Sequence, residues 1–227
     1  MKTFDHHLNI LPEPQKKIWN ELSPCKDLGF VLYGGTAISL HFGHRESIDF
    51  DFFSDVALDA KQESKLLSAL PLLKESEMIQ QELNACSYLT RDGVKLSFFG
   101  GIMFGRVGVP VLTNDNILQT ASLYDLLGTK LKVIMQRIEA KDYKDIAVML
   151  NSGMSLEKGL GCSLAMYGNQ FPPSESVKAL TYFHGGNLSI LTNDEKNILI
   201  SAVDKIQIHQ LPKIEIVSYS LGARETL

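Results

Sequence analysis

The chain has 227 residues, 44% of them hydrophobic and 21% charged, with a formal net charge of −4. This composition suits a globular protein with one sizeable core or two small ones, and the negative charge argues against a protein that coats nucleic acid. The three cysteines are far apart in the sequence and form no CxxC pair, which argues against a disulfide framework or a zinc knuckle. No apolar run approaches the roughly 20 residues that span a bilayer. We therefore expect a cytoplasmic protein with no membrane partner.

The first half of the chain combines short strand patterns with helical ones. Residues before 11 form a loose lead-in. Helices are predicted at 15–22, 36–42 and 58–70, strands at 30–33, 47–53, 78–83, 85–90 and 94–99, and an apolar stub at 109–112. The Asp92-Gly93 pair between the last two strands favours a tight hairpin turn.

The second half of the chain is helical. Apolar spacing predicts helices at 122–137, 141–151, 155–167, 174–183 and 193–208, whereas 212–227 is weakly patterned and 214–217 is either an edge strand or a tail. The sequence therefore predicts an α+β fold, with an N-terminal core at 1–121 and a helical domain at 122–227.

Carboxylates and apolar residues alternate at 48–53, IDFDFF. Because side chains repeat every second residue on a strand, Asp49 and Asp51 should project from one face. Two neighbouring carboxylates repel unless a cation lies between them, and Mg²⁺ with a phosphate substrate suits such oxygen ligands. The alternative is an exposed strand edge that carries charges, which fits poorly with the large apolar neighbours.

A glycine pair, Gly34-Gly35, precedes Thr36 at the start of a predicted helix. A bare backbone at a helix N-terminus presents free N–H groups and a positive dipole end to an anion. The same pair is also compatible with a simple turn from strand to helix. Together with the acids, it predicts a phosphate cradle beside a metal pair.

These residues carry a family resemblance. Gly34-Gly35-Thr36 followed by Asp49-Phe50-Asp51 resembles the GG-[S/T]…DxD signature of the polymerase-β-like nucleotidyltransferase superfamily. Within it, GGTAISLHFGHRESIDFDFF resembles the first motif of the AbiEii/AbiGii-type nucleotidyltransferase toxins, GGTAL followed by HRxSxDhDhF, where h is apolar. A second stretch at 122–149 resembles the helix pattern of that family, whose polar positions are here Asp125, Lys130, Arg137, Lys141, Asp142 and Asp145. The resemblance covers about residues 30–150.

The resemblance implies a polymerase-β-like core followed by a C-terminal helical domain. It also implies an Mg²⁺-dependent transfer of NMP from an NTP to the hydroxyl of a tRNA end or a protein, by a toxin paired with a cognate antitoxin. Asp49 and Asp51 would hold the metal, and Thr36 and the two glycines would cradle phosphates. Lys130 and Arg137 would neutralise the leaving group. The remaining nucleotide-binding residues that the resemblance implies are Arg45, Ser47, Arg137, Lys141 and Asp145.

The spacing of the cations supports this assignment. Lys130 and Arg137 are seven residues apart and would share one face of a continuous helix, with Lys141 one turn later. Cations on such a face can stabilise a leaving pyrophosphate. The alternative is a solvated helix face on which Lys141 and Lys144 pair with Asp142 and Asp145.

One position departs from the superfamily pattern. Many members carry a third carboxylate on a later strand, and in GVKLSFF at 93–99 that position is Ser97. A serine neither binds Mg²⁺ strongly nor acts as a base. Two hypotheses follow: an active nucleotidyltransferase, with Asp145 as one substitute for the missing acid, or a degenerate copy that binds nucleotide, RNA or a partner without turnover.

Overall fold

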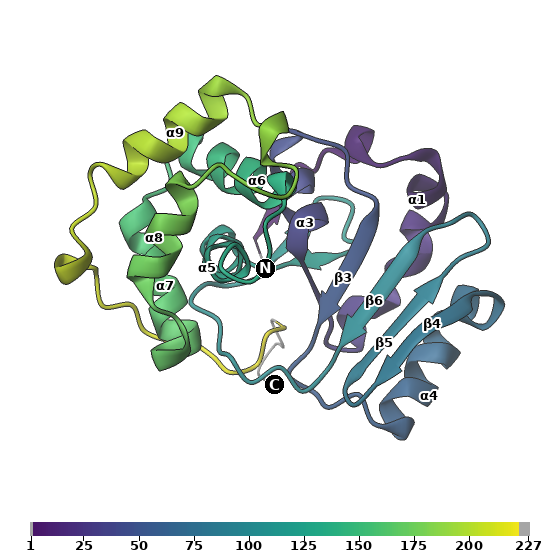
Figure 1. Ribbon diagram of the computed structural model, residues 1–227. Helices are drawn as coiled ribbons and strands as arrows, with labels where there is room; N and C mark the ends of the chain where they lie inside the picture. The colour runs from purple at the N-terminus through teal and green to yellow at the C-terminus, as the bar shows by residue number, and fades with distance from the viewer. Residues whose placement is uncertain (1, 223–227) are drawn as a thin grey trace. The chain divides into compact units, whose positions relative to one another are not determined.

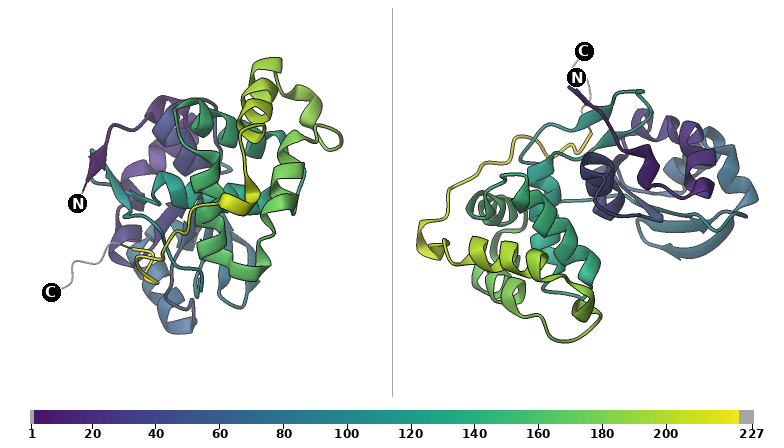
Figure 2. Two further views of the ribbon diagram at one scale, coloured as in Figure 1. Left: turned by 90° about the vertical axis from the view of Figure 1, so that its left-hand side faces the viewer. Right: turned by 90° about the horizontal axis from the view of Figure 1, so that it is seen from above.

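The computed structural model describes residues 2–222, and residues 223–227, the end of the weakly patterned stretch, lie outside the described part. The chain folds into two compact units (Figures 1 and 2). Within the described residues, the first comprises 2–104, 109–122 and 218–222, and the second comprises 105–108 and 123–217. The first unit is therefore assembled from three separate pieces of sequence.

The first unit is built on an eight-stranded mixed sheet with the order β1-β7-β8-β2-β3-β6-β5-β4. This mixed sheet with helices confirms the predicted α+β class. Its strands are β1 (Thr3–Phe4), β2 (Val31–Tyr33), β3 (Asp49–Phe53), β4 (Glu77–Glu82), β5 (Ala85–Leu89), β6 (Lys95–Phe99), β7 (Val111–Thr113) and β8 (Gln119–Thr120). Strand β3 lies inside the sheet, antiparallel to β2 and parallel to β6.

The two faces of this sheet differ in chemistry because the strand residues alternate. On β3, Phe50 and Phe52 are fully buried on one face, and Phe52 stacks on Phe98 of β6 at a ring-centroid distance of 5.2 Å. Helix α4 (Ala60–Ala69) covers the same face, since Tyr88 of β5 donates a hydrogen bond to Glu63 at 3.4 Å. The acids of β3 therefore occupy the opposite face, away from α4.

The remaining helices of this unit are α1 (Glu13–Ile18), α2 (Pro24–Asp27) and α3 (Gly34–Phe42), which directly connects β2 to the segment before β3. The predicted lead-in before residue 11 is wrong, because Thr3–Phe4 forms strand β1 in parallel register with β7. Strands β1 and β8 have two residues each, too few for a period to be recognised, and only their pairing with distant partners defines them.

The second unit is helical, and its helices gather in the green and yellow part of Figure 2. They are α5 (Leu123–Val133), α6 (Ala140–Asn151), α7 (Leu156–Tyr167), α8 (Pro173–Thr181) and α9 (Asn193–Val203). Ser155 caps α7 by accepting a hydrogen bond from the Lys158 amide, and Thr192 and Glu195 form a capping box at α9. The weakly patterned residues 214–217 form no strand, so they are a tail.

The predicted helix at 122–137 is too long. Helix α5 ends at Val133, and Arg137 lies in the connection to α6. Helices α5 and α7 pack closely, because a Cβ at Gly159 would lie 2.6 Å from Leu127 Cδ2. Ser163 of α7 donates a hydrogen bond to the Gly128 carbonyl at 3.0 Å. Among the described residues, no helix is long and apolar enough to cross a bilayer.

Candidate active site

Asp49 and Asp51 project from one face of β3, as the alternation predicts. Both are half-buried, whereas the intervening Phe50 is fully buried on the other face. In the sheet register, Asp51 lies beside Tyr33 of β2 and Ser97 of β6, and Asp49 lies beside Lys95 of β6. Cross-strand neighbours share a face, so this row brings two carboxylates, an ammonium and two hydroxyls together.

Helix α3 begins at Gly34, two residues earlier than predicted, and its first turn lies against Asp51. Gly34 has φ of +70°, and a Cβ at this position would lie 2.7 Å from Asp51 Oδ2. Only glycine adopts this conformation without strain and leaves room for the carboxylate. The backbone of Gly34, which is predicted to bind phosphate, is thus held close to Asp51.

The Thr36 and Ser47 hydroxyls are buried and bonded within the protein. Thr36 Oγ1 donates to the Asp49 carbonyl oxygen and lies 2.7 Å from Ser47 Oγ. A hydroxyl has one proton, so Ser47 must donate to Thr36, and neither hydroxyl has a proton left for a phosphate. In this arrangement the two side chains fix the start of α3 to the acid strand. Arg45 is half-buried and donates to the Glu46 carbonyl at 2.9 Å.

Ser97 occupies the position beside Asp51 where the superfamily pattern places a third carboxylate. It is 1% exposed, and its hydroxyl accepts a hydrogen bond from Ser87 at 3.1 Å. Among residues 2–222, no group of three or more His, Cys, Asp or Glu side chains is placed to hold a metal ion. Two carboxylates on one strand face nevertheless fit Mg²⁺, which is often bound by one or two carboxylates together with the phosphates of the substrate.

Lys130 is at the centre of a buried ion cluster in the second unit. Its Nζ lies 2.6 Å from Asp142 Oδ1 and 2.7 Å from Asp145 Oδ2, and the three side chains are 5% exposed or less. Arg137 Nε lies 2.8 Å from Asp142 Oδ2. These four side chains carry two positive and two negative charges, so the cluster is neutral as a whole.

The cluster differs from both sequence interpretations of this stretch. Lys130 and Arg137 do not share a helix face, because α5 ends before Arg137. Nor is it a solvated face, since Lys141 pairs with Glu139 at 2.9 Å and Lys144 approaches Glu195 at 3.9 Å, while the two aspartates are buried. The ion pairs of Lys130 join it to residues 12 and 15 positions later, on another helix, so the spacing within one helix does not predict them.

Electrostatics keep Asp142 ionised in this cluster. Burial by itself would raise the pKa of the Asp142 carboxyl, but hydrogen bonds from Arg137 and the charge of Lys130 outweigh it and hold the pKa below the ordinary value. Asp125, another residue of the family pattern, accepts hydrogen bonds from the Val107 and Gly108 amides at 2.7 and 3.1 Å. It therefore anchors the short loop at 105–108.

His41 of α3 belongs to the support of the first unit. Its ring stacks on Phe4 at a centroid distance of 3.7 Å, and Nε2 lies 2.9 Å from Thr120 Oγ1. Burial lowers the pKa of the His41 imidazole to about 4. The neutral ring thus ties α3 to β1 and β8.

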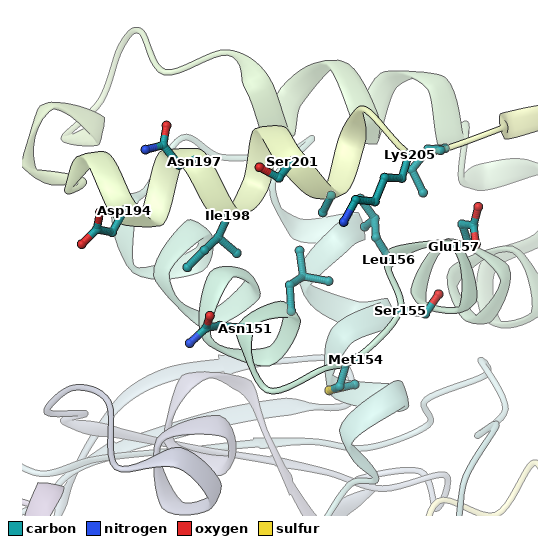
Figure 3. Close-up of a pocket in the computed structure, with 13 residues that line it drawn as sticks. Asn151, Met154, Ser155, Leu156, Glu157, Asp194, Asn197, Ile198, Ser201 and Lys205 are labelled. Carbon is teal, nitrogen blue, oxygen red and sulfur yellow. The ribbon is translucent and has the colours of Figure 1, made fainter.

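A groove of about 780 Å³ lies in the helical unit between α9 and the start of α7 (Figure 3). Ile198 and Ser201 of α9, together with Lys205 just after the helix, face Asn151 and Leu156 across it. None of the predicted site residues lines this groove. The chemistry predicted from the sequence therefore belongs elsewhere.

Lys95 is the residue of the acid face that the motif comparison missed. The signal was present, because the period of two that places Ser97 on this face also places Lys95 there, beside Asp49. The family motif directs attention to the carboxylate position only. The register of β3 and β6 shows what else lies next to the acids.

Comparisons with known proteins identify a family and similar chains. The family model described as "Nucleotidyl transferase AbiEii toxin, Type IV TA system" matches residues 24–171. An uncharacterised protein of Aquifex aeolicus (strain VF5) is 32% identical over 165 residues, which cover 71% of this chain and 76% of that protein.

A solved structure is also similar. MenT4, a nucleotidyltransferase toxin of Mycobacterium tuberculosis H37Rv, matches with a TM-score of 0.53 and 12% identity, over 86% of this chain and 84% of its own. At this identity the likeness concerns the fold alone. The family match covers both the acid strand and the ion cluster of the helical unit. The chain belongs to the AbiEii nucleotidyltransferase toxin family, and it is a nucleotidyltransferase of that family.

Proposed function

We propose that this protein transfers the NMP moiety of an NTP to an acceptor hydroxyl, on a tRNA end or a protein side chain, in an Mg²⁺-dependent reaction. The observation that carries the proposal is the placement of Asp49 and Asp51 on one half-buried strand face, beside the glycine turn of α3. In the cell the enzyme would act in the cytoplasm as a toxin paired with a cognate antitoxin.

The proposed reaction is a single displacement at phosphorus. The acceptor oxygen forms a bond to the α-phosphorus, the bond to the bridging oxygen breaks, and pyrophosphate leaves with that electron pair while the acceptor proton passes to water. Bound Mg²⁺ would supply positive charge to the triphosphate. Asp49 and Asp51 would hold it, and the Gly34 and Gly35 amides would bind phosphate oxygens.

We assign supporting roles to the other polar residues of the family pattern. Thr36 and Ser47 would keep the acid strand in place through their mutual hydrogen bond. Arg45 would contribute to nucleotide binding next to the acids. In the helical unit, Lys130, Arg137, Lys141 and Asp145 would act on the leaving group or the acceptor, and substitution of each tests this.

The second candidate function is a binding module without turnover. The observation that favours it is Ser97, a buried serine that donates no carboxylate to the site beside Asp51. Such a protein would bind nucleotide with metal through the same two aspartates. It would release the nucleotide unchanged.

Labelled nucleotides separate the two functions. The protein is incubated with each α-labelled NTP, Mg²⁺ and total tRNA or cell lysate, in parallel with Asp49→Ala, Asp51→Ala and the exposed control Asp92→Ala of the hairpin turn. We expect label transfer by the unsubstituted protein and the control, and a loss of about 100-fold or more in the two site variants. Metal-dependent binding of NTP with no transfer to any acceptor would establish the binding module instead.

A further inference from the structure

Lys95 lies on the acid face at the level of Asp49. The parallel pairing of β3 and β6 puts Asp49 beside Lys95 and Asp51 beside Ser97, so all four side chains leave the same face of the sheet. Adjacent strands are about 4.8 Å apart. A flexible lysine at that distance brings its ammonium to the same ligand that Asp49 reaches.

The charges on this face differ from those of a three-carboxylate site. Three carboxylates carry three negative charges and suit two divalent cations that clamp a phosphoryl group. Here Asp49 and Asp51 carry two, Ser97 carries none, and Lys95 adds one positive charge. Strand β6 thus lacks the carboxylate that would hold a second metal ion and carries a lysine two residues earlier.

The alternative role for Lys95 is to neutralise Asp49 in a surface ion pair. Among the described residues, Asp49 and Lys95 form no ion pair with each other or with another side chain, although they are neighbours in the register. Both side chains are half-buried and directed to the face that the glycine turn borders. Opposite charges that are adjacent and unpaired are available to a ligand that carries both a cation and an anion, such as a metal-bound triphosphate.

We propose that Lys95 binds a phosphate group of the nucleotide beside Asp49 and takes the place of a second divalent cation, so that the site uses one metal ion per nucleotide. Lysine is suited to this role because its ammonium binds phosphate as a point charge. The inference rests on the proposed function, since it assigns the nucleotide to the face of Asp49 and Asp51. Lys95 exchanges no proton or bond in the reaction and acts through its charge.

Metal counting tests the proposal without turnover. The unsubstituted protein is saturated with an NTP analogue that carries a non-cleavable α,β-methylene bridge, and bound Mn²⁺ is counted by electron paramagnetic resonance. We expect one Mn²⁺ per bound nucleotide. A count of two per nucleotide would overturn the proposal, whatever the variants do.

Affinity for the same analogue, measured by calorimetry, tests the lysine itself. Lys95→Met should weaken binding by about tenfold or more, as expected when a charged contact to phosphate is lost, and Lys95→Arg should restore most of the affinity. Lys61→Met, on α4 at the opposite face of the sheet, is the matched control and should bind as the unsubstituted protein does. Thermal unfolding of each variant verifies that it is folded, and Lys95→Gln replaces any that is not.

The outcomes separate this inference from the function on which it rests. Unchanged analogue affinity in folded Lys95→Met, with label transfer intact in the unsubstituted protein, would refute the role of Lys95 alone. If the unsubstituted protein bound no nucleotide in the presence of metal, the proposed function would fail, and the role of Lys95 with it.

Discussion

Each of the two units contains a group of charged side chains, and the two groups differ in burial and in ion pairing. In the sheet unit, Asp49 and Lys95 are half-buried neighbours that, among the described residues, form no ion pair. In the helical unit, Lys130 and its aspartate partners are buried and their charges balance with that of Arg137. A fully buried charge is stable only when it is paired, whereas a partly solvated charge can remain unpaired until a ligand binds.

Burial and charge balance therefore distinguish the polar residues of the two units. Disruption of the buried, neutral Lys130 cluster should lower the free energy of unfolding, whatever it does to the transfer reaction. A face with surplus charge should affect mainly ligand affinity. Three substitutions and one pH dependence test this division.

Lys130→Met should be the most destabilising change. It removes the ammonium from the buried Asp142, which keeps only Arg137, and from the buried Asp145. Breaking a buried ion pair in this way costs about 3–5 kcal/mol of unfolding free energy. Urea denaturation measures the loss. Lys178→Met is the control, because its pair with Glu175 is exposed. A loss as small as that of the control would show that the cluster gives no structural support.

The free energy of unfolding should fall as the pH is lowered from 6.5 to about 4, because His41 has a lower pKa in the folded protein than in the unfolded chain. The folded protein keeps this imidazole neutral, so below pH 6.5 the unfolded chain binds a proton more readily than the folded one. The contribution of His41 to the free energy of unfolding is therefore fully present only above pH 6.5. The difference corresponds to roughly 3 kcal/mol.

Urea midpoints measured at several pH values check the His41 prediction. His41→Gln should flatten the dependence between pH 6.5 and 4.5, since the glutamine does not titrate. The Asp142 contribution is lost only at lower pH, because its folded pKa lies below the ordinary value. Parallel curves for the variant and the unsubstituted protein would contradict the assignment to His41.

Gly34→Ala should cost about 1–2 kcal/mol of unfolding free energy and also weaken nucleotide binding, because the positive φ and the approach to Asp51 both oppose a Cβ. Gly93→Ala separates the two causes. Its φ is +81°, but nothing lies within 4 Å of the added Cβ. If both variants bind nucleotide equally well, the contact of Gly34 with Asp51 has no part in binding.

Lys141→Ala should change the free energy of unfolding by no more than about 0.5 kcal/mol, because exposed ion pairs contribute little. Its partner Glu139 is 39% exposed and Lys141 itself 45%. Thermal unfolding measures the stability, and label transfer measures the predicted nucleotide role. A large loss of unfolding free energy in Lys141→Ala would contradict the expectation that buried ion pairs of the helical unit contribute more to stability than exposed ones.

The sequence predicted the acid strand well because the relevant information is local. A period of two over six residues places Asp49 and Asp51 on one face, and β3 confirms it. The Lys130 cluster was not predictable in the same way. Helix α5 ends after Val133 without a glycine or proline to mark the end, and the partners of Lys130 belong to another helix.

The edge strand β1 was missed for a related reason. Strand β1 consists of Thr3 and Phe4 alone, and its partner on β7 lies about a hundred residues further along the chain. No local pattern can signal such a pairing. Likewise, the position of Lys95 beside Asp49 follows only from the register of two strands, although each strand was predicted separately.

The first unit also depends on the residues at 218–222. Asp55, directly after the acid strand, accepts hydrogen bonds from the Ser220 hydroxyl and the Leu221 amide at 3.2 and 3.0 Å, and Leu221 is fully buried. The ribosome adds these residues only after it has made the whole helical unit. A nascent chain therefore lacks part of the unit that bears the acids until synthesis passes residue 221. A fragment cut at residue 122 would lack the same anchor.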